Sequence, residues 1–332
     1  MSSGDRLQDN FRRTINYMRI SVTDRCNLRC IYCMPPEGVP WIPHENILTF
    51  EEIERIVRAT ATVGMRKIRI TGGEPLVRRG IVQLVARLAS IPGIKDIAMT
   101  TNALLMPQFA ESLARAGLQR INVSLDTLKP ERFARITRFN YLDKVLAGIE
   151  AAERAGLAPI KINAVVLRGV NDDEVVDLAR LSVDRPWHIR FIEAMPLGGN
   201  LSVEKDGYIS ADEIMKSLTV LGEPEVCEGP GGNGPARYFK IHGARGTVGV
   251  ISPMSHFYCE SCNRVRLSAE GRLRLCLFAD DEIDLRTPLR EGATGEEIVA
   301  IFHKAIAAKP QRHNLKVGHS NCSLRALSQI GG

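Results

Sequence analysis

The chain has 332 residues, which is length for about two ordinary domains or one large barrel with an extension, and which excludes a small disulfide-stapled module. Hydrophobic residues make up 44% and charged residues 25% of the sequence, so the chain can bury a core and is not a disordered tail. The excess of 44 Lys and Arg over 38 Asp and Glu gives a net charge of +6, which alone does not indicate a nucleic-acid partner.

Six short β-rich runs predict strands in the first two thirds of the chain, at 18–22, 67–71, 96–101, 120–125, 160–167 and 188–194. Helical patterns separate them, at 51–64, 81–90, 107–117, 143–156 and 172–183. This alternation predicts a parallel sheet. Polar residues alternate along the strands, as Arg69 with Thr71 and Lys161 with Asn163, which favours an incomplete barrel with a polar interior over a doubly wound sheet.

Chemically distinctive residues lie at the carboxyl ends of the predicted strands. Functional sites on parallel α/β sheets form at these ends. They are the cysteines from Cys26, the 72–75 segment Gly-Gly-Glu-Pro, the 100–102 segment Thr-Thr-Asn, Ser124 with Asp126, and Met195. After Met195 the strand and helix alternation stops and a glycine-rich stretch follows at 229–236. We therefore predict two domains, at 1–220 and 221–332.

Six of the eight cysteines fall into two closely spaced groups, which are Cys26, Cys30 and Cys33, and Cys259, Cys262 and Cys276. In a reducing compartment such spacing is more typical of metal binding than of disulfides. A structural zinc ion and a 4Fe-4S cluster each take four ligands, so each group lacks one. Either His44 or His256 completes a zinc site, or a small molecule binds at an open iron.

The first group resembles the signature of the radical S-adenosylmethionine (SAM) superfamily, because its C-x3-C-x2-C spacing follows the first strand and Tyr32 precedes the third cysteine. In that superfamily three thiolates hold a 4Fe-4S cluster and SAM chelates the fourth iron. One electron then cleaves SAM to methionine and a 5'-deoxyadenosyl radical. The TGGEP sequence at 71–75 resembles the segment that binds the SAM amino group, although alone it is equally typical of a tight turn.

The second group begins a predicted β-hairpin, with strands at 264–268 and 272–278 and a turn at 269–271. Period-two alternation places Arg264 with Arg266 on one face of the first strand, and Arg272 and Arg274 with Cys276 on one face of the second. Guanidinium groups bind phosphate bidentately, so arginines beside a metal site favour an anionic substrate. The alternative is a solvated charged hairpin.

Nearly the whole chain resembles the GTP 3',8-cyclase (MoaA) family of molybdenum cofactor biosynthesis, within the radical SAM superfamily. The matching motifs are both cysteine groups, TGGEP at 71–75, TTN at 100–102, INVSLDTL at 121–128, RFIEAMP at 190–196 and the segment 246–278. Two positions depart from the family pattern. Ala103 stands where the family has glycine, and Ala194 stands where it often has an aromatic residue.

This resemblance implies an α/β fold, an incomplete (βα)6 TIM-like radical SAM barrel with a smaller C-terminal domain that carries a second iron-sulfur cluster. The cofactors would be two 4Fe-4S clusters and SAM. The first cysteine group would hold the SAM cluster, and Cys259, Cys262 and Cys276 would hold the second cluster, which binds the substrate. The SAM contacts would be Tyr32, Gly73, Ser124 and Met195.

The resemblance also implies how the substrate is held. The GTP contacts would be Arg19, Arg69, Thr100, Lys161, Arg264, Val265 and Arg266. The catalytic residues would be Arg264, Arg266, Gly331 and Gly332, of which the last two form a tail that reaches into the active site.

The implied activity is that of a lyase-class enzyme. The radical would abstract the ribose C3' hydrogen of GTP, and the C3' radical would add to guanine C8 to give (8S)-3',8-cyclo-7,8-dihydroguanosine 5'-triphosphate. Besides GTP, the implied partners are an electron donor of flavodoxin or ferredoxin type and a downstream cyclic pyranopterin monophosphate synthase. A homodimer is left open.

Two other readings stay open at this point. One is a radical SAM enzyme with an auxiliary cluster that modifies a peptide. The other is a zinc-dependent protein that binds nucleic acid through the arginines of 264–274. No stretch approaches the roughly 18 apolar residues of a membrane span, and residues 1–14 lack the apolar segment of a secretory signal. We therefore expect a cytoplasmic protein with neither a membrane nor a nucleic-acid partner.

Overall fold

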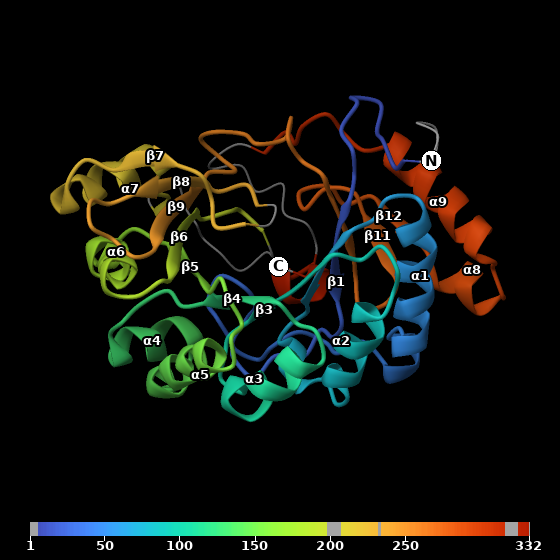
Figure 1. Cartoon of the computed structure of the whole chain (residues 1–332), viewed down its shortest axis with the longest axis horizontal. Coiled ribbons are helices and arrows are strands. Elements are labelled where there is room, and N and C mark those ends of the chain that lie inside the picture. The colour runs from blue at the N-terminus through green and yellow to red at the C-terminus, as the bar shows by residue number, and fades with distance from the viewer. Residues whose placement is uncertain (1–5, 198–206, 232–233, 316–324, 332) are drawn as a thin grey trace.

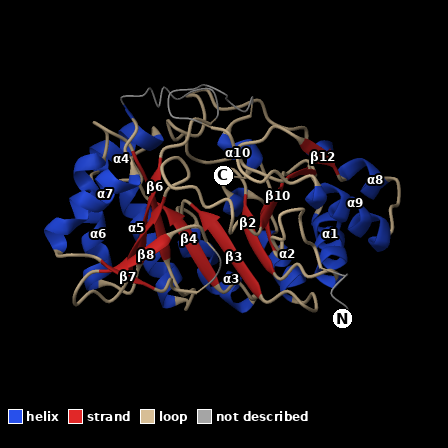
Figure 2. Cartoon of the chain, turned by 90° about the horizontal axis from the view of Figure 1, so that it is seen from above, coloured by secondary structure: helices blue, strands red, loops and turns tan. Residues whose placement is uncertain are grey.

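The computed structural model describes residues 6–197, 207–231, 234–315 and 325–331. Its centre is one curved sheet of twelve strands (Figures 1 and 2). Six of them lie side by side in chain order and run parallel. They are β1 (Tyr17–Ser21), β2 (Lys67–Thr71), β3 (Asp96–Thr101), β4 (Arg120–Ser124), β5 (Lys161–Val166) and β6 (His188–Glu193). All six predicted strands are therefore confirmed.

The later part of the chain extends both edges of the same sheet. At one edge β10 (Arg264–Leu267) lies parallel to β1, and β11 (Arg272–Arg274) and β12 (Glu282–Asp284) follow it in antiparallel order. At the other edge β9 (Thr247–Ile251) lies parallel to β6, followed by β8 (Arg237–Lys240) and β7 (Glu225–Cys227). The predicted hairpin is confirmed for 264–274, but its second strand ends at Arg274 and not at 278, so Cys276 lies beyond the strand and not on its face. Strands from both sides of the predicted boundary at residue 220 belong to this one sheet. A separate domain at 221–332 stays a prediction.

Helices cover the outer face of the sheet (Figure 1). After the parallel strands come α1 (Phe50–Thr62), α2 (Ile81–Ala89), α3 (Met106–Arg115), α4 (Pro130–Thr137), α5 (Leu142–Arg154) and α6 (Val175–Asp184). The remaining described α-helices are α7 (Ala211–Leu218), α8 (Arg286–Arg290), α9 (Gly295–Ala307) and α10 (Leu327–Ile330). The sequence did not predict α4, whose eight residues follow a loop directly.

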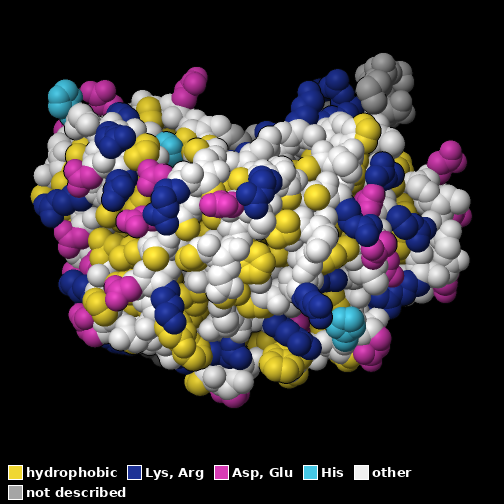
Figure 3. All heavy atoms as spheres, turned by 60° about the horizontal axis from the view of Figure 1, so that its bottom comes forward, with side chains coloured by type: hydrophobic (Ala, Val, Ile, Leu, Met, Phe, Trp, Pro, Cys, Tyr) yellow, Lys and Arg dark blue, Asp and Glu magenta, His cyan; other side chains and the backbone are white. Residues whose placement is uncertain are grey.

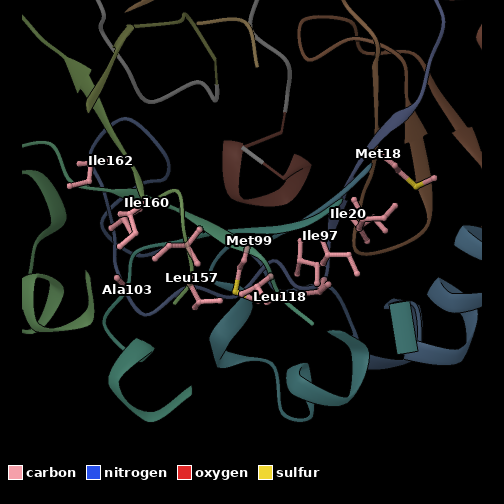
Figure 4. Close-up of a cluster of buried hydrophobic side chains, with 14 of the residues drawn as sticks. Met18, Ile20, Ile97, Met99, Ala103, Leu118, Leu157, Ile160 and Ile162 are labelled. Carbon is pink, nitrogen blue, oxygen red and sulfur yellow. The ribbon is translucent and has the colours of Figure 1, made fainter. Parts of the chain in front are cut away.

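Alternate residues of each strand face the helices and form the core (Figure 4). Met18 and Ile20 of β1 and Met99 of β3 are fully buried there. The residues between them, such as Arg19, face the inside of the curved sheet. This confirms the predicted polar interior.

The surface in Figure 3 carries interspersed positive and negative side chains, with hydrophobic side chains scattered among them. In the part of the chain that the structure describes, no helix combines the length and the apolar character needed to cross a bilayer.

Candidate active site

A cavity lies on the inner side of the sheet, at the carboxyl ends of the parallel strands. It brings together most of the predicted site residues. Those that line it are Arg19, Cys26, Cys30, Tyr32, Cys33, Arg69, Gly73, Thr100, Ser124, Met195, Arg264 and Arg266. A smaller pocket adjoins this central cavity and contains Cys259, Cys262 and Cys276. The two share four lining residues, which are Tyr258, Arg264, Arg266 and Leu277.

The first cysteine group lies on the loop after β1. Burial raises the pKa of the Cys26 thiol to about 12 and that of Cys33 to about 11. Three thiolates are therefore costly here unless a bound cation balances them, and the irons of a cluster supply that charge. Among the described residues no three Cys, His, Asp or Glu side chains are placed to hold a single metal ion, as zinc would require.

The histidines of the zinc alternative do not approach either cysteine group. His44 and His256 are exposed, and neither lines the central cavity or the adjoining pocket. His313 does line the pocket of the second group, but its Nε2 lies 3.1 Å from the Pro253 carbonyl oxygen and its Nδ1 accepts a hydrogen bond of 3.3 Å from the Leu315 amide. The arrangement therefore fits a cluster with an open iron at each group better than a zinc site completed by His44 or His256.

The TGGEP segment fastens the end of β2 to the first cysteine loop. The Gly73 amide donates to the Thr23 carbonyl at 2.6 Å, and a Cβ on Gly73 would lie 2.3 Å from the Arg25 carbonyl oxygen. The Glu74 carboxylate accepts hydrogen bonds of 2.7 Å from the Thr101 hydroxyl and the Asn102 amide. Burial raises the pKa of Glu74 to about 7. The segment thus joins three strand ends, which an isolated tight turn would not do.

One predicted SAM contact, Tyr32, is held by Asp126, which the sequence analysis named at a strand end but gave no role in the site. The Tyr32 hydroxyl donates to Asp126 Oδ2 at 2.7 Å, and the Val165 amide donates to Asp126 Oδ1 at 2.8 Å. Burial raises the pKa of Asp126 to about 6. Its position at a strand end, two residues after Ser124, was the available signal. Asp126 fixes the Tyr32 ring relative to the cavity.

Arginines from neighbouring strands line one wall of the cavity. The strand register places Arg19 between Arg266 of β10 and Arg69 of β2. The Nε atoms of Arg69 and Arg264 have no hydrogen-bond partner among the described residues, and neither side chain pairs with a described carboxylate. Arg264 interacts with the Cys262 thiol, whereas Arg69 has no anionic partner among the described residues. Because a buried cation is costly without an anionic partner, Arg69 favours an anionic ligand in the cavity.

Arg190 of β6 belongs to this wall but was not predicted. It is 4% exposed, it lines the cavity, and its Nε lacks a partner among the described residues. Period-two alternation from His188 would have identified it. Lys161 lies on the same inner face but outside the cavity lining, and its ammonium donates to the Gly231 carbonyl at 2.7 Å. The side chain of Val265 points the other way, into the core.

The second cysteine group lies between strands. Cys259 and Cys262 precede β10, and Cys276 follows β11. Burial raises the pKa of the Cys262 thiol, but the charges of Arg264 and Lys309 outweigh this effect and lower that pKa to about 7. Cys262 therefore already favours the thiolate form that a cluster needs, whereas burial raises the pKa of the Cys259 thiol.

The prediction that Arg272 and Arg274 of the second hairpin strand are available to an anionic substrate is wrong. Arg272 pairs with Asp284 at 3.0 Å and Arg274 pairs with Glu282 at 3.1 Å, both on β12. Neither arginine lines the cavity or the pocket. Acidic residues of the neighbouring strand neutralise them, so only Arg264 and Arg266 of the hairpin are available to a ligand.

The C-terminal segment reaches the cavity. Figure 2 shows α10 and the C-terminal end near the middle of the curved sheet, and Leu327 and Ser328 line the cavity. The carbonyl of Gly331 accepts a hydrogen bond of 2.6 Å from Arg266. Gly331 has φ +73°, a conformation that favours glycine. Gly332 lies outside the described residues.

Comparisons with known proteins cover almost the entire chain. The model of the radical SAM superfamily matches residues 20–182, and the model described as Molybdenum Cofactor Synthesis C matches residues 187–315. A GTP 3',8-cyclase of Pelotomaculum thermopropionicum is 53% identical over 327 residues, which cover 98% of this chain and 100% of the relative. A GTP 3',8-cyclase of Heliobacterium modesticaldum is 52% identical over 98% of this chain and 99% of the relative.

A solved structure shares the fold. It is Streptococcus suis SuiB bound to S-adenosylmethionine, with a TM-score of 0.60 at 15% sequence identity, over 89% of this chain and 69% of that chain. At this identity the likeness concerns the fold alone.

Proposed function

The chain belongs to the GTP 3',8-cyclase family of radical SAM enzymes, and on that premise we propose that it converts GTP to 3',8-cyclo-7,8-dihydro-GTP in molybdenum cofactor biosynthesis. The observation that carries the proposal is the shared cavity, which joins the first cysteine group to a wall of buried arginines, of which Arg69 and Arg264 pair with no carboxylate among the described residues. A nucleoside triphosphate is an anion of the size and charge that such a wall accommodates.

The residues present fit the cofactors of the family. Cys26, Cys30 and Cys33 would hold the first 4Fe-4S cluster, and Cys259, Cys262 and Cys276 would hold the second. When SAM is bound at the first cluster, it supplies the radical that removes the ribose C3' hydrogen. Tyr32, Gly73, Ser124 and Met195, which all line the cavity, would contact SAM.

The protein's own contribution is to hold GTP in one orientation. Arg19, Arg69 and Arg190 would bind the triphosphate from the strands, while Arg264 and Arg266 connect the cavity to the pocket of the second cysteine group. Contacts at both ends of the nucleotide restrict its rotation, so C3' and C8 meet before the reaction begins. In a partly enclosed site each charged contact is also stronger than it is in water. Thr100 and Lys161 would complete the binding site.

The C-terminal glycines would act beside Arg266. The hydrogen bond from Arg266 to Gly331 supports this role, because a tail held beside the arginine wall would close the cavity and exclude water. This supports the assignment of Arg264, Arg266, Gly331 and Gly332 as residues of the reaction.

We further propose the partners that the family resemblance implies. A flavodoxin or ferredoxin type of protein would supply the electron, and a cyclic pyranopterin monophosphate synthase would receive the product. A homodimer and a cytoplasmic location stay predictions.

The test is the product itself. Protein reconstituted with iron and sulfide under anaerobic conditions is incubated with SAM, a reductant and GTP, and the nucleotides are separated by chromatography with mass detection. We expect a new nucleotide with the mass of GTP, absent for Cys30→Ala. SAM cleavage that proceeds equally without GTP, and that leaves GTP unchanged, would favour the peptide-modifying alternative.

A further inference from the structure

A buried lysine lies beside the second cysteine group. Lys309 follows α9 and is 3% exposed. Its ammonium donates to the carbonyl of Arg264 at 3.0 Å and to the carbonyl of Leu275. Arg264 comes two residues after Cys262, and Leu275 directly precedes Cys276. Lys309 therefore ties together the two strands that carry these cysteines.

The charge of Lys309 has no carboxylate partner among the described residues, because its hydrogen bonds all go to backbone carbonyls. Arg13, another buried cation near the same cysteines, differs in this respect. It pairs with Asp9 at 2.5 Å while donating to the Cys259 carbonyl at 2.7 Å. An unpaired buried ammonium is costly, so the fold must supply an anion for Lys309 elsewhere.

The candidates for that anion are the Cys262 and Cys276 sulfurs, whose charges act on Lys309. Burial lowers the pKa of Lys309, and the Cys262 and Cys276 thiolates oppose this shift. The hydrogen-bonded position of the ammonium, between the backbones adjoining both cysteines, agrees with this. The charge of Lys309 is therefore balanced when the second cysteine group is in its thiolate form.

We propose that Lys309 is a positioning residue for the second cluster, whose ammonium offsets the negative charge of the thiolate-bound cluster and raises its reduction potential. The inference rests on the proposed function in one respect, namely that Cys259, Cys262 and Cys276 hold a 4Fe-4S cluster. Reduction transfers one electron from the reductant to the cluster and makes it more negative. A fixed cation nearby stabilises the reduced form more than the oxidised form.

Three variants separate charge from packing. Lys309→Gln retains N–H donors for the two carbonyls but removes the charge, and Lys309→Arg retains the charge. Lys304→Gln removes an exposed lysine from α9 and serves as the matched control. Each full-length protein is reconstituted with iron and sulfide, its iron is counted, and its clusters are titrated with reductant while their paramagnetic signals are recorded. Added SAM perturbs the first cluster's signal and so distinguishes the two.

We expect Lys309→Gln to make the reduction potential of the second cluster more negative by about 59 mV. This shift corresponds to about a tenfold change in the equilibrium constant for one-electron reduction. The first cluster should not shift, and Lys309→Arg and Lys304→Gln should match the wild type. An unchanged second potential in Lys309→Gln, with about eight irons per chain as two such clusters require, would overturn the inference.

Loss of the second cluster from one or both Lys309 variants would also test whether the charge of Lys309 is required. If Lys309→Gln binds only the first cluster and Lys309→Arg binds both, the need for charge is supported. If both variants lose the second cluster equally, the side chain acts through packing and the inference is wrong. A wild-type protein with only about four irons would instead refute the second cluster itself, and with it the proposed function.

Discussion

The guanidinium of Arg266 donates a 2.6 Å hydrogen bond to the carbonyl oxygen of Gly331, 65 positions further along the chain. Both residues are buried, Arg266 at 6% exposure. The contact brings the C-terminal segment to β10, on the wall of the central cavity. It argues that this segment belongs to the site and is not a frayed end of the chain.

Removal of residues 331–332 should abolish GTP cyclisation while both clusters are retained, because Gly331 binds Arg266 and the atoms nearest to a Cβ at Gly331 belong to Thr71 and Ser21, which are not predicted cluster ligands. Iron content and product formation in the truncated protein check this. Unchanged turnover would show that the tail has no part in the reaction.

Gly331→Ala is a milder version of the same test. The residue has φ +73°, and a Cβ would lie 3.1 Å from Thr71 Cγ2. A left-handed alanine costs about 1–2 kcal/mol, so the tail should leave its position more often and kcat/KM should fall by roughly tenfold. Steady-state kinetics measure the effect, and a rate equal to that of the wild type would contradict it.

Gly73→Ala should disrupt SAM binding, because the added Cβ would lie 2.3 Å from the Arg25 carbonyl oxygen beside Cys26. Overpacking of this kind costs about 1–3 kcal/mol and displaces the cysteine loop. Gly295→Ala is the matched control, since its Cβ would approach nothing closer than 3.9 Å. SAM affinity and iron retention are measured for both variants. Equal SAM affinities would show that the close packing at Gly73 is not required.

Binding of GTP should be accompanied by proton uptake at Lys161. Burial and the charge of Arg190 lower the pKa of Lys161 to about 7, so at pH 8 its amine is mostly neutral before GTP binds. The triphosphate favours the ammonium and raises that pKa, which draws a proton from the buffer. Calorimetry at pH 8 in two buffers of different ionisation enthalpy should give an uptake of up to about one proton.

Lys161→Arg is the control for this titration, because a guanidinium stays charged throughout this range of pH. The variant should bind GTP with little proton uptake. If it takes up as many protons as the wild type, another group is responsible and Lys161 does not contact the triphosphate.

Arg190→Met should raise the KM for GTP by about 10- to 100-fold, since a hydrogen bond to a charged group contributes about 1.5–3 kcal/mol. Arg190→Lys should retain part of this affinity because it keeps the charge but not the planar fork. Arg180→Met, on the exposed side of α6, is a control for the loss of one surface arginine. A KM for Arg190→Met equal to that of the control would remove Arg190 from the substrate site.

The parts of the fold that could be predicted from the sequence are those with a local signal. Period-two alternation located β1 to β6, and cysteine spacing located both metal-binding groups. The position of β9 and β10 beside β6 and β1 has no such signal, because those pairings join residues more than 50 positions apart.

The same limit explains the errors at the site. Alternation placed Arg272 and Arg274 on a common face but could not show that Asp284 and Glu282 would lie opposite them. Ala103, which stands where the family has glycine, adopts a backbone conformation that the sequence could not show. Its φ of +63° is the left-handed conformation in which the family's glycine is unstrained.

The central claim is tested most directly with GTP deuterated at C3'. The reconstituted protein is incubated under anaerobic conditions with SAM, a reductant and this substrate, and the 5'-deoxyadenosine that forms is analysed by mass. The account predicts one deuterium in the 5'-deoxyadenosine, which would establish SAM cleavage, the substrate and the abstracted position together. Unlabelled 5'-deoxyadenosine, formed in equal amount without GTP, would contradict it.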